Sequence, residues 1–166
     1  MRKTTVSLAA AGLILAGAAP ATAGTEQGTQ VVSRMLLANG YTSLCLGVQS
    51  AGPRVLQKVC SLASEGIHWT VDQPFGDAVA VYRIRNDEHG MCLDNDNTSV
   101  FLAPCNAAQD AGQLWRFPDG SYGRVEAYVN GKVLTGWSDG AASLRSWSPS
   151  DADLSQKQRW RQVPRP

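Results

Sequence analysis

The sequence predicts an all-β fold of three similar units, because a tryptophan recurs at intervals of 46 and 45 residues, as Trp69, Trp115 and Trp160. Short segments such as residues 78–84 and 125–129 place apolar residues among polar neighbours, which is typical of half-buried strands. No stretch shows the period of a long helix. Three units of about four strands, none able to bury its apolar face alone, would close on one another about a pseudo-threefold axis. That arrangement is a β-trefoil.

Two of the three tryptophans end a Gln-x-Trp motif, with Gln113 and Gln158 two positions before the ring, whereas Ile67 occupies that position in the first copy. The period of the tryptophans follows the repeat, so we expect all three to pack in a shared core. We expect the two glutamine amides to bond loop backbone to strand, satisfying buried groups that would otherwise cost about 1–3 kcal/mol each. The motif is thus first a structural device that closes each repeat.

Two further sets of segments recur in phase with the tryptophans and define the repeats. The first set is residues 45–47, 92–94 and 133–135, and the second is residues 55–60, 101–105 and 143–147. Turn-forming pairs such as Asn39-Gly40 and Asn130-Gly131 separate the strands. We therefore expect one domain over residues 31–166, with repeats at about 31–77, 78–120 and 121–166, each about 42–47 residues long.

The N-terminus has the form of a secretory signal peptide over residues 1–23. Arg2 and Lys3 precede an apolar run, and Ala21-Thr22-Ala23 has the small-x-small form that signal peptidase accepts. The apolar run is too short to span a bilayer comfortably, so we expect no membrane anchor. The mature chain is expected to begin at Gly24 with a flexible N-terminus over residues 24–30, and the protein is expected to be secreted and extracellular.

Charge and cysteine content exclude several classes of partner. Without Arg2 and Lys3 the chain carries 13 basic and 14 acidic side chains, with no run of like charge, so we expect no binding to nucleic acid. Four cysteines in an exported chain indicate disulfides, for which three connectivities exist in principle. A metal site is not expected, because no Cys-x-x-Cys spacing occurs and the only histidines are His68 and His89.

The pattern resembles the ricin-type (R-type) lectin β-trefoil family, in which each of three repeats carries a cysteine, a leucine and an aspartate, a second cysteine and a closing Gln-x-Trp. The resemblance covers the whole mature chain. It implies up to three shallow saccharide pockets, one per repeat. In each pocket the aspartate accepts hydrogen bonds from sugar hydroxyls, an aromatic residue two before the second cysteine stacks on the sugar, and an asparagine before the Gln-x-Trp adds a donor.

Aligned in this way, the cysteines fall at matching places in repeats one and two. Repeat symmetry then selects the disulfides Cys45–Cys60 and Cys92–Cys105. By loop closure each would contribute about 3 kcal/mol. Repeat three replaces its pair by Val133 and Trp147, so there we expect an apolar contact in the structural core in place of the disulfide.

The ligand positions of repeats one and two depart from the family pattern. Repeat one has Gly47, Lys58 and Gly66, so we expect no family-type sugar site there. Repeat two keeps the acceptor Asp94 and the closing Gln113, but it has Ala103 at the stacking position and Gly112 in place of the asparagine. Because only repeat two retains the acidic acceptor, it is the first choice for a ligand, with weak binding expected.

Asp94 also opens the run 94–97, which ends at Asn97 and allows two interpretations. The run could contribute ligand contacts from Asp94 and Asn97, or it could be a polar turn held by bonds from side chain to backbone. Both interpretations stay open at this point.

Repeat three departs at each ligand position, with Thr135, Arg145 and Lys157, but it adds Trp137 in the loop 136–140. A tryptophan in a loop of Gly, Ser and Asp is less easily explained by packing, because loops run over surfaces and carry function. If exposed, Trp137 with Asp139 and Arg145 would form an unconventional pocket able to stack and to hydrogen-bond. Packing of Trp137 over the axis is an equally open alternative.

No catalytic signature is present, since the sequence has no G-x-S-x-G, no H-E-x-x-H and no glycine-rich phosphate loop. We therefore expect neither an enzyme nor a cofactor. The leading functional hypothesis is a secreted, lectin-like carbohydrate-binding protein. The alternatives are a sugar-binding-deficient trefoil that contacts a protein partner, as a subunit of a toxin complex would, or an inhibitor of a secreted hydrolase.

Overall fold

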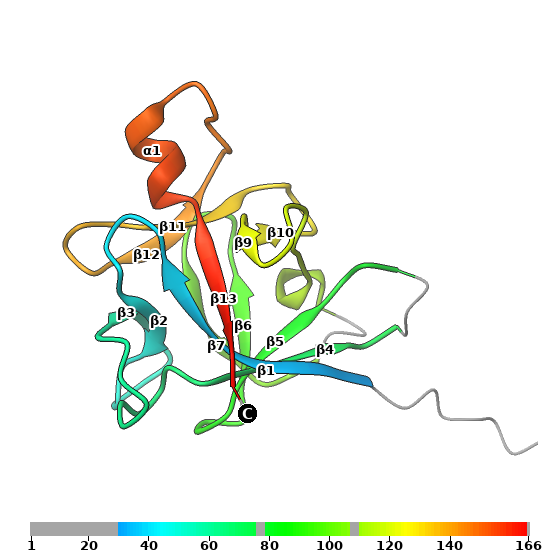
Figure 1. The fold of residues 1–166 in the computed structure, drawn as a ribbon. Coiled ribbons are helices and arrows are strands. Elements are labelled where there is room, and N and C mark those ends of the chain that lie inside the picture. Colours follow the sequence, from blue (N-terminus) through cyan, green and yellow to red (C-terminus); the bar gives the residue numbers. More distant parts are fainter. Residues whose placement is uncertain (1–29, 76–78, 107–109, 166) are drawn as a thin grey trace, which may run out of the picture.

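The computed structural model describes residues 30–75, 79–106 and 110–165 (Figure 1). The expected signal peptide and the expected flexible N-terminus lie outside these residues, except for Gln30, at which the first strand already begins. Almost all regular structure is β-strand, and α1 projects from one end of the molecule (Figure 1).

The elements follow one another in the order that three repeats of short strands would give. Repeat one holds β1 (Gln30–Asn39), β2 (Cys45–Val48), β3 (Val55–Lys58) and β4 (Trp69–Gln73). Repeat two holds β5 (Arg83–Asn86), β6 (Cys92–Asn95), β7 (Val100–Ala103), the short 3-10 helix η1 (Ala111–Gln113) and β8 (Trp115–Arg116). Repeat three holds β9 (Tyr122–Gly123), β10 (Glu126–Ala127), β11 (Val133–Gly136), β12 (Ala142–Arg145), α1 (Ala152–Lys157) and β13 (Trp160–Pro164).

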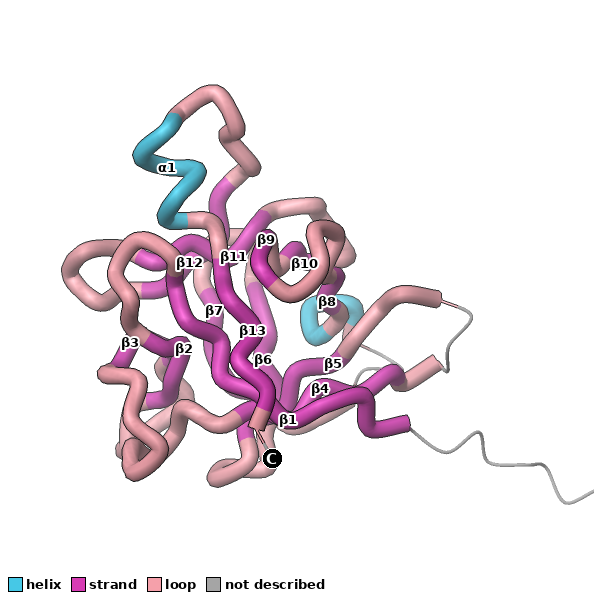
Figure 2. Tube along the Cα trace, viewed as in Figure 1, coloured by secondary structure: helices cyan, strands magenta, loops and turns pink. Residues whose placement is uncertain are grey.

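All strand pairs are antiparallel, and β1 pairs with three strands of the larger sheet, β2, β4 and β13 (Figure 2). That sheet runs in the order β3-β2-β1-β4-β5-β6-β7, and β13 pairs with both β1 and β9. The smaller sheet has the order β12-β11-β10-β8. Pairing of β1 with β13 joins the first and last strands, so the chain closes on itself.

Three hairpins, β2–β3, β6–β7 and β11–β12, occupy equivalent places in the three repeats and meet one another. Isolated bridges join them in pairs, through Arg54 and Phe101, Leu56 and Ala141, and Ser99 and Ser143. Each hairpin also donates one backbone hydrogen bond of the same kind to a neighbouring hairpin: Gln57 N–H to Gly140 O, Leu102 N–H to Pro53 O and Leu144 N–H to Thr98 O, at 2.7, 2.8 and 2.8 Å. This triangle is the pseudo-threefold contact that the repeats predict, and with it the fold is a β-trefoil.

The three recurring tryptophans lie in the shared core, with at most 1% of each residue exposed. Each indole donates its Nε1 hydrogen to the carbonyl of the leucine that follows the first cysteine position. The acceptors are Leu46, Leu93 and Leu134, at 2.9, 3.0 and 2.9 Å. A buried indole N–H needs such a partner, and the repeat supplies the same one three times.

Both expected disulfides are present, Cys45–Cys60 and Cys92–Cys105. The expectation for repeat three is half right, because Val133 is fully buried whereas Trp147 is only half-buried and lies outside the hydrophobic core. The guanidinium groups of Arg124 and Arg159 flank the Trp147 ring at 5.1 and 5.8 Å from its centroid. Placing Trp147 in the core was therefore wrong: the indole packs against cations at the surface.

Candidate functional site

The acidic acceptor of repeat two, Asp94, lies at the end of β6 beneath the short helix η1. The residue is 4% exposed. Its Oδ2 accepts a hydrogen bond from Gln113 Nε2 at 3.1 Å, and its Oδ1 accepts one from the backbone N–H of Asn95 at 2.6 Å. Burial raises the pKa of the Asp94 carboxyl, and the bonds from Gln113 and Asn95 oppose that rise.

The backbone at Gly112 closes over this carboxylate. A side chain at position 112 would collide with Asp94 Oδ1, and the Asn95 side chain donates to the Gly112 carbonyl at 2.6 Å. The glycine that replaces the family asparagine is therefore needed for close approach. In this arrangement the oxygens of Asp94 serve internal bonds, and Ala103 gives no ring on which a sugar could stack.

The rest of the run 94–97 forms a polar turn. Asp96 Oδ1 accepts bonds from the backbone of Ser99 at 2.7 Å and of Thr98 at 3.1 Å, and these bonds lower the pKa of Asp96. Asn97 has a positive φ of 79° and accepts a bond from Asn130 of repeat three at 2.8 Å. Asn97 thus contributes to the contact between two repeats.

The two motif glutamines make equivalent bonds. Gln113 Nε2 donates to the carbonyl of Pro104 at 2.9 Å, and its Oε1 accepts from the backbone of Asn106 at 2.8 Å. Gln158 makes the matching pair, to the Ser146 carbonyl at 2.8 Å and from the Ser148 backbone at 3.1 Å. Both amides therefore bond loop backbone as expected.

Position 135 in repeat three has the same internal role as Asp94. Thr135 is fully buried, and its hydroxyl accepts from Gln158 Nε2 at 3.4 Å and donates to the Val133 carbonyl at 3.1 Å. In repeat one the corresponding pair is apolar, since Ile67 lies so close to Gly47 that a Cβ there would be 2.9 Å from its side chain. The family acceptor position is internal in each repeat.

Trp137, by contrast, is half-buried at the turn between β11 and β12, and three hydrogen bonds fix its position. Its Nε1 donates to Ser143 Oγ at 2.8 Å, and its backbone N–H donates to the Ala141 carbonyl at 2.9 Å. Its carbonyl accepts a bond of 2.8 Å from the buried side-chain amide of Gln57, which belongs to β3 of repeat one. The indole is therefore positioned by two repeats before any ligand arrives.

Two cationic groups flank this indole. The Arg145 guanidinium, at the end of β12, and the Lys157 ammonium, at the end of α1, each lie 5.6 Å from the Trp137 ring centroid. Lys157 also lies 4.8 Å from the ring of Tyr41, which is 45% exposed. The structure thus brings together Trp137 and Arg145, whereas Asp139 accepts the Ala141 N–H in the tight turn at 2.9 Å.

Tyr41 and Lys157 were not among the ligand residues that the sequence indicated. Tyr41 belongs to the turn between β1 and β2, far from Trp137 in the chain, and no periodic signal marks it. Lys157 was noted only as a departure from the family asparagine. An ion pair with Asp153 holds the Lys157 ammonium, and the hydrogen bond to Asp153 raises the pKa of Lys157. We call Tyr41, Trp137, Arg145 and Lys157 the repeat-three cluster.

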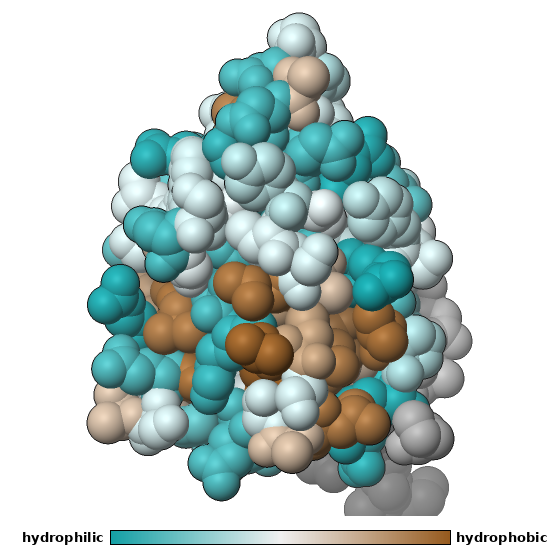
Figure 3. Space-filling view, turned by 60° about the vertical axis from the view of Figure 1, so that its left-hand side comes forward, coloured by the Kyte–Doolittle hydropathy of each residue, from teal (hydrophilic) through white to brown (hydrophobic). Residues whose placement is uncertain are grey.

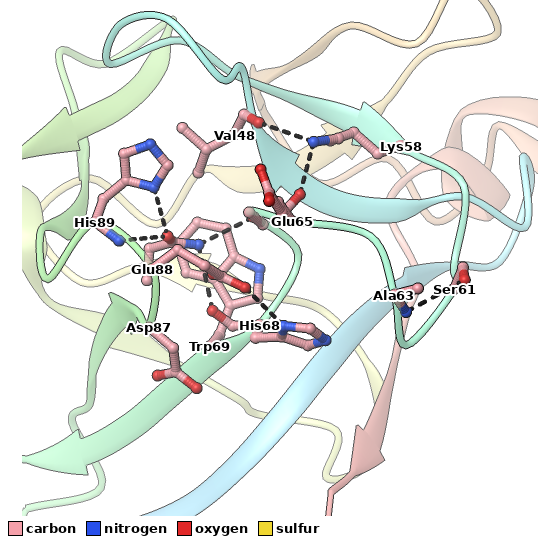
Figure 4. A network of polar contacts seen from close by, with 12 residues as sticks. Val48, Lys58, Ser61, Ala63, Glu65, His68, Trp69, Asp87, Glu88 and His89 are labelled. Atoms are coloured by element: carbon pink, nitrogen blue, oxygen red, sulfur yellow. Dashed lines mark hydrogen bonds and ion pairs between the residues drawn. The ribbon is translucent and has the colours of Figure 1, made fainter.

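Repeat one has a cavity of about 290 Å³ at the equivalent place, and Figure 4 shows the polar contacts beside it. Lys58, at the family stacking position, donates to the carbonyls of Glu65 at 2.6 Å and Val48 at 3.4 Å. The lysine ammonium is therefore bonded to backbone, and the side chain offers no ring on which a sugar could stack. The lining consists of Val48, Ser50, Lys58, Glu65, Gly66, Glu88 and His89.

A groove of about 410 Å³ lies apart from these places, between the strand ends of repeats two and three. The Tyr82 and Phe117 rings pack 5.3 Å apart, and the Arg116 guanidinium lies 4.4 Å from the Tyr128 ring. Val79 and Tyr128 are 44% and 41% exposed. We call these five residues the aromatic groove.

Within residues 30–75, 79–106 and 110–165, no helix is long and apolar enough to cross a membrane. The same residues contain no group of three or more His, Cys, Asp or Glu side chains that could hold a metal ion.

Solved structures with the same fold include proteins of several kinds. The designed three-fold symmetric protein ThreeFoil has a TM-score of 0.65 at 22% identity, over 80% of this chain and 99% of its own. The Haemophilus ducreyi cytolethal distending toxin has a TM-score of 0.64 at 15% identity, over 80% of this chain and 83% of its own. A GlcNAcα1-4Gal-releasing endo-β-galactosidase from Clostridium perfringens has a TM-score of 0.64 at 16% identity, over 81% of this chain and 33% of its own.

At these identities the likeness shows the fold alone, and none of the curated proteins compared matches this chain. The sequence matches the family described as "Ricin-type beta-trefoil lectin domain" over residues 33–160. That match spans all three repeats, in phase with the three buried tryptophans and the two disulfides. The chain belongs to the ricin-type β-trefoil lectin family.

Proposed function

We propose that this protein is a secreted carbohydrate-binding protein whose ligand site is the repeat-three cluster. The observation that carries the proposal is Trp137, a half-buried residue whose indole donates to Ser143 and whose backbone is bonded to Ala141 and Gln57. Aromatic rings bind the C–H face of a sugar, and a ring already held in place loses little conformational entropy when a ligand binds. Membership of a lectin family supports the same function.

The proposal moves the site from repeat two to repeat three. Asp94 is 4% exposed and already bonded to Gln113 and Asn95, so a sugar hydroxyl would have to displace an internal bond to reach it. Repeat three has lost the acidic acceptor but offers an aromatic ring with donors beside it. The protein acts by binding rather than by catalysis, and secretion agrees with its two disulfides.

The test is a glycan array with the purified chain that begins at Gly24. We expect Trp137→Ala to lose all glycan signals that the wild type shows, because the stacking surface is removed. Asp94→Asn is the matched control in repeat two and is expected to keep them. Loss of binding in Asp94→Asn with retention in Trp137→Ala would return the site to repeat two.

A second candidate function, recognition of a protein partner, is favoured by the aromatic groove. Exposed Val79 and Tyr128 beside Tyr82 and Phe117 offer the kind of apolar, aromatic surface that forms the centre of protein interfaces. We expect a partner captured from culture supernatant and then purified to bind Trp137→Ala as well as the wild type. The double variant Val79→Ser/Tyr128→Ser should bind it at least tenfold more weakly, and unchanged affinity would rule out this groove as the interface.

A further inference from the structure

The charges of this near-neutral chain are unevenly distributed between the repeats. Residues 31–120 carry six basic and nine acidic side chains, whereas residues 121–166 carry seven basic and four acidic ones. Positive charge therefore concentrates in repeat three, which also holds the proposed site. Around α1 and the end of the molecule from which it projects, the surface is mainly hydrophilic (Figure 3). A local excess of one sign attracts ligands of the opposite sign even when net charge is small.

Arg145 is the basic group of the cluster that is free to bind a ligand. The ion pairs found among the described residues involve His68, Arg83, Arg116, Arg124 and Lys157, and none involves Arg145. Arg145 is exposed, and its guanidinium lies over the Trp137 ring. A guanidinium matches the two oxygens of a carboxylate or sulfate with two parallel hydrogen bonds.

Lys157 adds a second cation at the same ring. Its ammonium lies 5.6 Å from Trp137 and 4.8 Å from Tyr41, and its ion-pair partner Asp153 has a side chain that is 62% exposed. An anion that approaches Trp137 therefore meets the Arg145 guanidinium on β12 and, on α1, the Lys157 ammonium, whose charge is shared between the ligand and Asp153. A neutral sugar would gain less, because cations next to the ring reduce the apolar area left for its C–H face.

A further basic residue, Arg161, lines a cavity that includes the chain neighbour of Tyr41. Arg161, Asn39, Gly40 and Tyr122 are among the residues that line a cavity of about 430 Å³. Gly40 precedes Tyr41 in the chain, and its N–H donates to the carbonyl of Arg159 at 2.8 Å. A ligand with repeated negative charges could contact both the repeat-three cluster and the cavity lined by Arg161.

Resting on the proposed function, we propose that the repeat-three cluster selects acidic saccharides. The negative group of the sugar, a carboxylate or a sulfate, binds Arg145 and Lys157, and the adjoining pyranose contacts the edge of Trp137 and Tyr41. An acidic polysaccharide with several such groups reaches Arg161 as well. Neutral saccharides bind more weakly because they make no charge-assisted hydrogen bonds with Arg145.

The test uses pairs of charged and neutral ligands on the same sugar backbone: oligogalacturonate against its methyl ester, and dextran sulfate against dextran. Affinities are measured by isothermal titration calorimetry. We expect each charged ligand to bind at least tenfold more tightly than its neutral counterpart, with affinity falling several-fold as salt is raised from low to high concentration. Binding of both acids identifies a general anion contact, and binding of only one identifies carboxylate or sulfate as the group selected.

Arg145→Gln is the diagnostic variant, and Arg34→Gln, an exposed arginine on β1 outside the cluster, is the matched control. Thermal unfolding checks that both fold. We expect Arg145→Gln to lose at least tenfold in affinity for the charged ligands and to keep its affinity for the neutral ones, while Arg34→Gln binds like the wild type.

Failure of this inference differs from failure of the proposed function. If neutral and charged saccharides bind equally, and Trp137→Ala removes both while Arg145→Gln removes neither, acidic selectivity is overturned and the carbohydrate site stands. If no saccharide binds, both proposals are overturned. Polyglutamate and double-stranded DNA serve as polyanions without sugar acids, and binding of either with equal affinity would overturn selectivity for acidic saccharides.

Discussion

At the scale of single residues, three different residue pairs occupy one equivalent buried position, one pair in each repeat. The family acceptor position faces the position two before the tryptophan, and this pair is Asp94 with Gln113, Thr135 with Gln158, and Gly47 with Ile67. Two of these pairs are hydrogen-bonded polar side chains and the third is apolar, so no pair leaves a buried polar group without a partner. The acidic member is the costly solution, because a carboxylate must be buried.

That cost gives Asp94 a testable pH dependence. Burial raises the pKa of Asp94 above its ordinary value of 3.8, so the folded protein holds this proton more tightly than the unfolded chain does. Its stabilising contribution is present below the unfolded pKa and is lost as the pH rises through the folded pKa. In urea denaturation we expect the free energy of unfolding of the wild type, relative to Asp94→Asn, to fall as the pH rises from acid through the raised pKa of Asp94.

Asp96 is the matched control, because backbone bonds from Ser99 and Thr98 lower the pKa of its carboxyl. The pH dependence of the unfolding free energy therefore has the opposite sign, and the wild type should gain stability relative to Asp96→Asn as the pH rises from acid. A rise in the Asp94 comparison, or equal slopes in the two, would contradict the internal role assigned to Asp94.

At the scale of elements, the site depends on a strand of another repeat. Gln57 on β3 donates to the carbonyls of Trp137 and Ala141, at 2.8 and 2.9 Å, and accepts from the Thr42 hydroxyl at 2.5 Å. One buried amide thus bonds the turn between β11 and β12 to the first hairpin and to the turn that carries Tyr41.

Removing the Gln57 amide should weaken the support of Trp137 without changing any residue of the repeat-three cluster. Gln57→Met keeps the length of the side chain but removes one of the two donors to each of the Trp137 and Ala141 carbonyls. At about 0.5–1.5 kcal/mol for each lost hydrogen bond, we expect a loss of about 1–3 kcal/mol in unfolding free energy. Saccharide affinity should fall several-fold although Trp137 and Arg145 remain. Denaturant unfolding and calorimetry measure the two effects, with Gln49→Met, at an exposed position, as the control. Unchanged affinity in Gln57→Met would show that Trp137 does not need this support.

At the scale of the whole molecule, stability comes from one core shared by three repeats and from two similar disulfides. The disulfides close 15 and 13 residues of chain, and each belongs to one repeat. Repeat three has none, and its first and last strands are held by the pairing of β13 with β1 and with β9.

The two disulfides should therefore contribute similar amounts of stability. We expect Cys45→Ala/Cys60→Ala and Cys92→Ala/Cys105→Ala each to lower the free energy of unfolding by about 3 kcal/mol, since loop-closure entropy depends only weakly on such a small difference in length. Guanidinium denaturation of the two double variants measures this. An unchanged midpoint in either would show that the bond is not a stability element.

Secretion is tested on the whole chain. From Ala21-Thr22-Ala23 we expect export with cleavage before Gly24, so an intact-mass measurement on protein from culture supernatant should give a chain of residues 24–166. The mass should also show loss of four hydrogens for the two disulfides. A chain that keeps Met1, or a lipid adduct, would contradict this prediction.

The sequence by itself determined the features that repeat. The period of Trp69, Trp115 and Trp160, with the cysteines in phase, was enough to predict the trefoil, the disulfides and the bonds of the motif glutamines. These features follow from local spacing, because each repeat must bury the same face against its two neighbours. A run such as 94–97 could likewise be read as a turn, since its Asp and Asn side chains bond to backbone a few residues away.

Only the tertiary structure decided what breaks the symmetry. Asp94 is buried beneath η1, Trp147 lies between two arginines at the surface, and Trp137 is joined by Tyr41 and Lys157 from distant parts of the chain. Exposure and cation–ring contacts depend on how three hairpins and α1 pack together, and that packing leaves no periodic trace in the sequence. The site proposed here therefore follows from contacts between repeats, whereas the fold that holds it follows from their similarity.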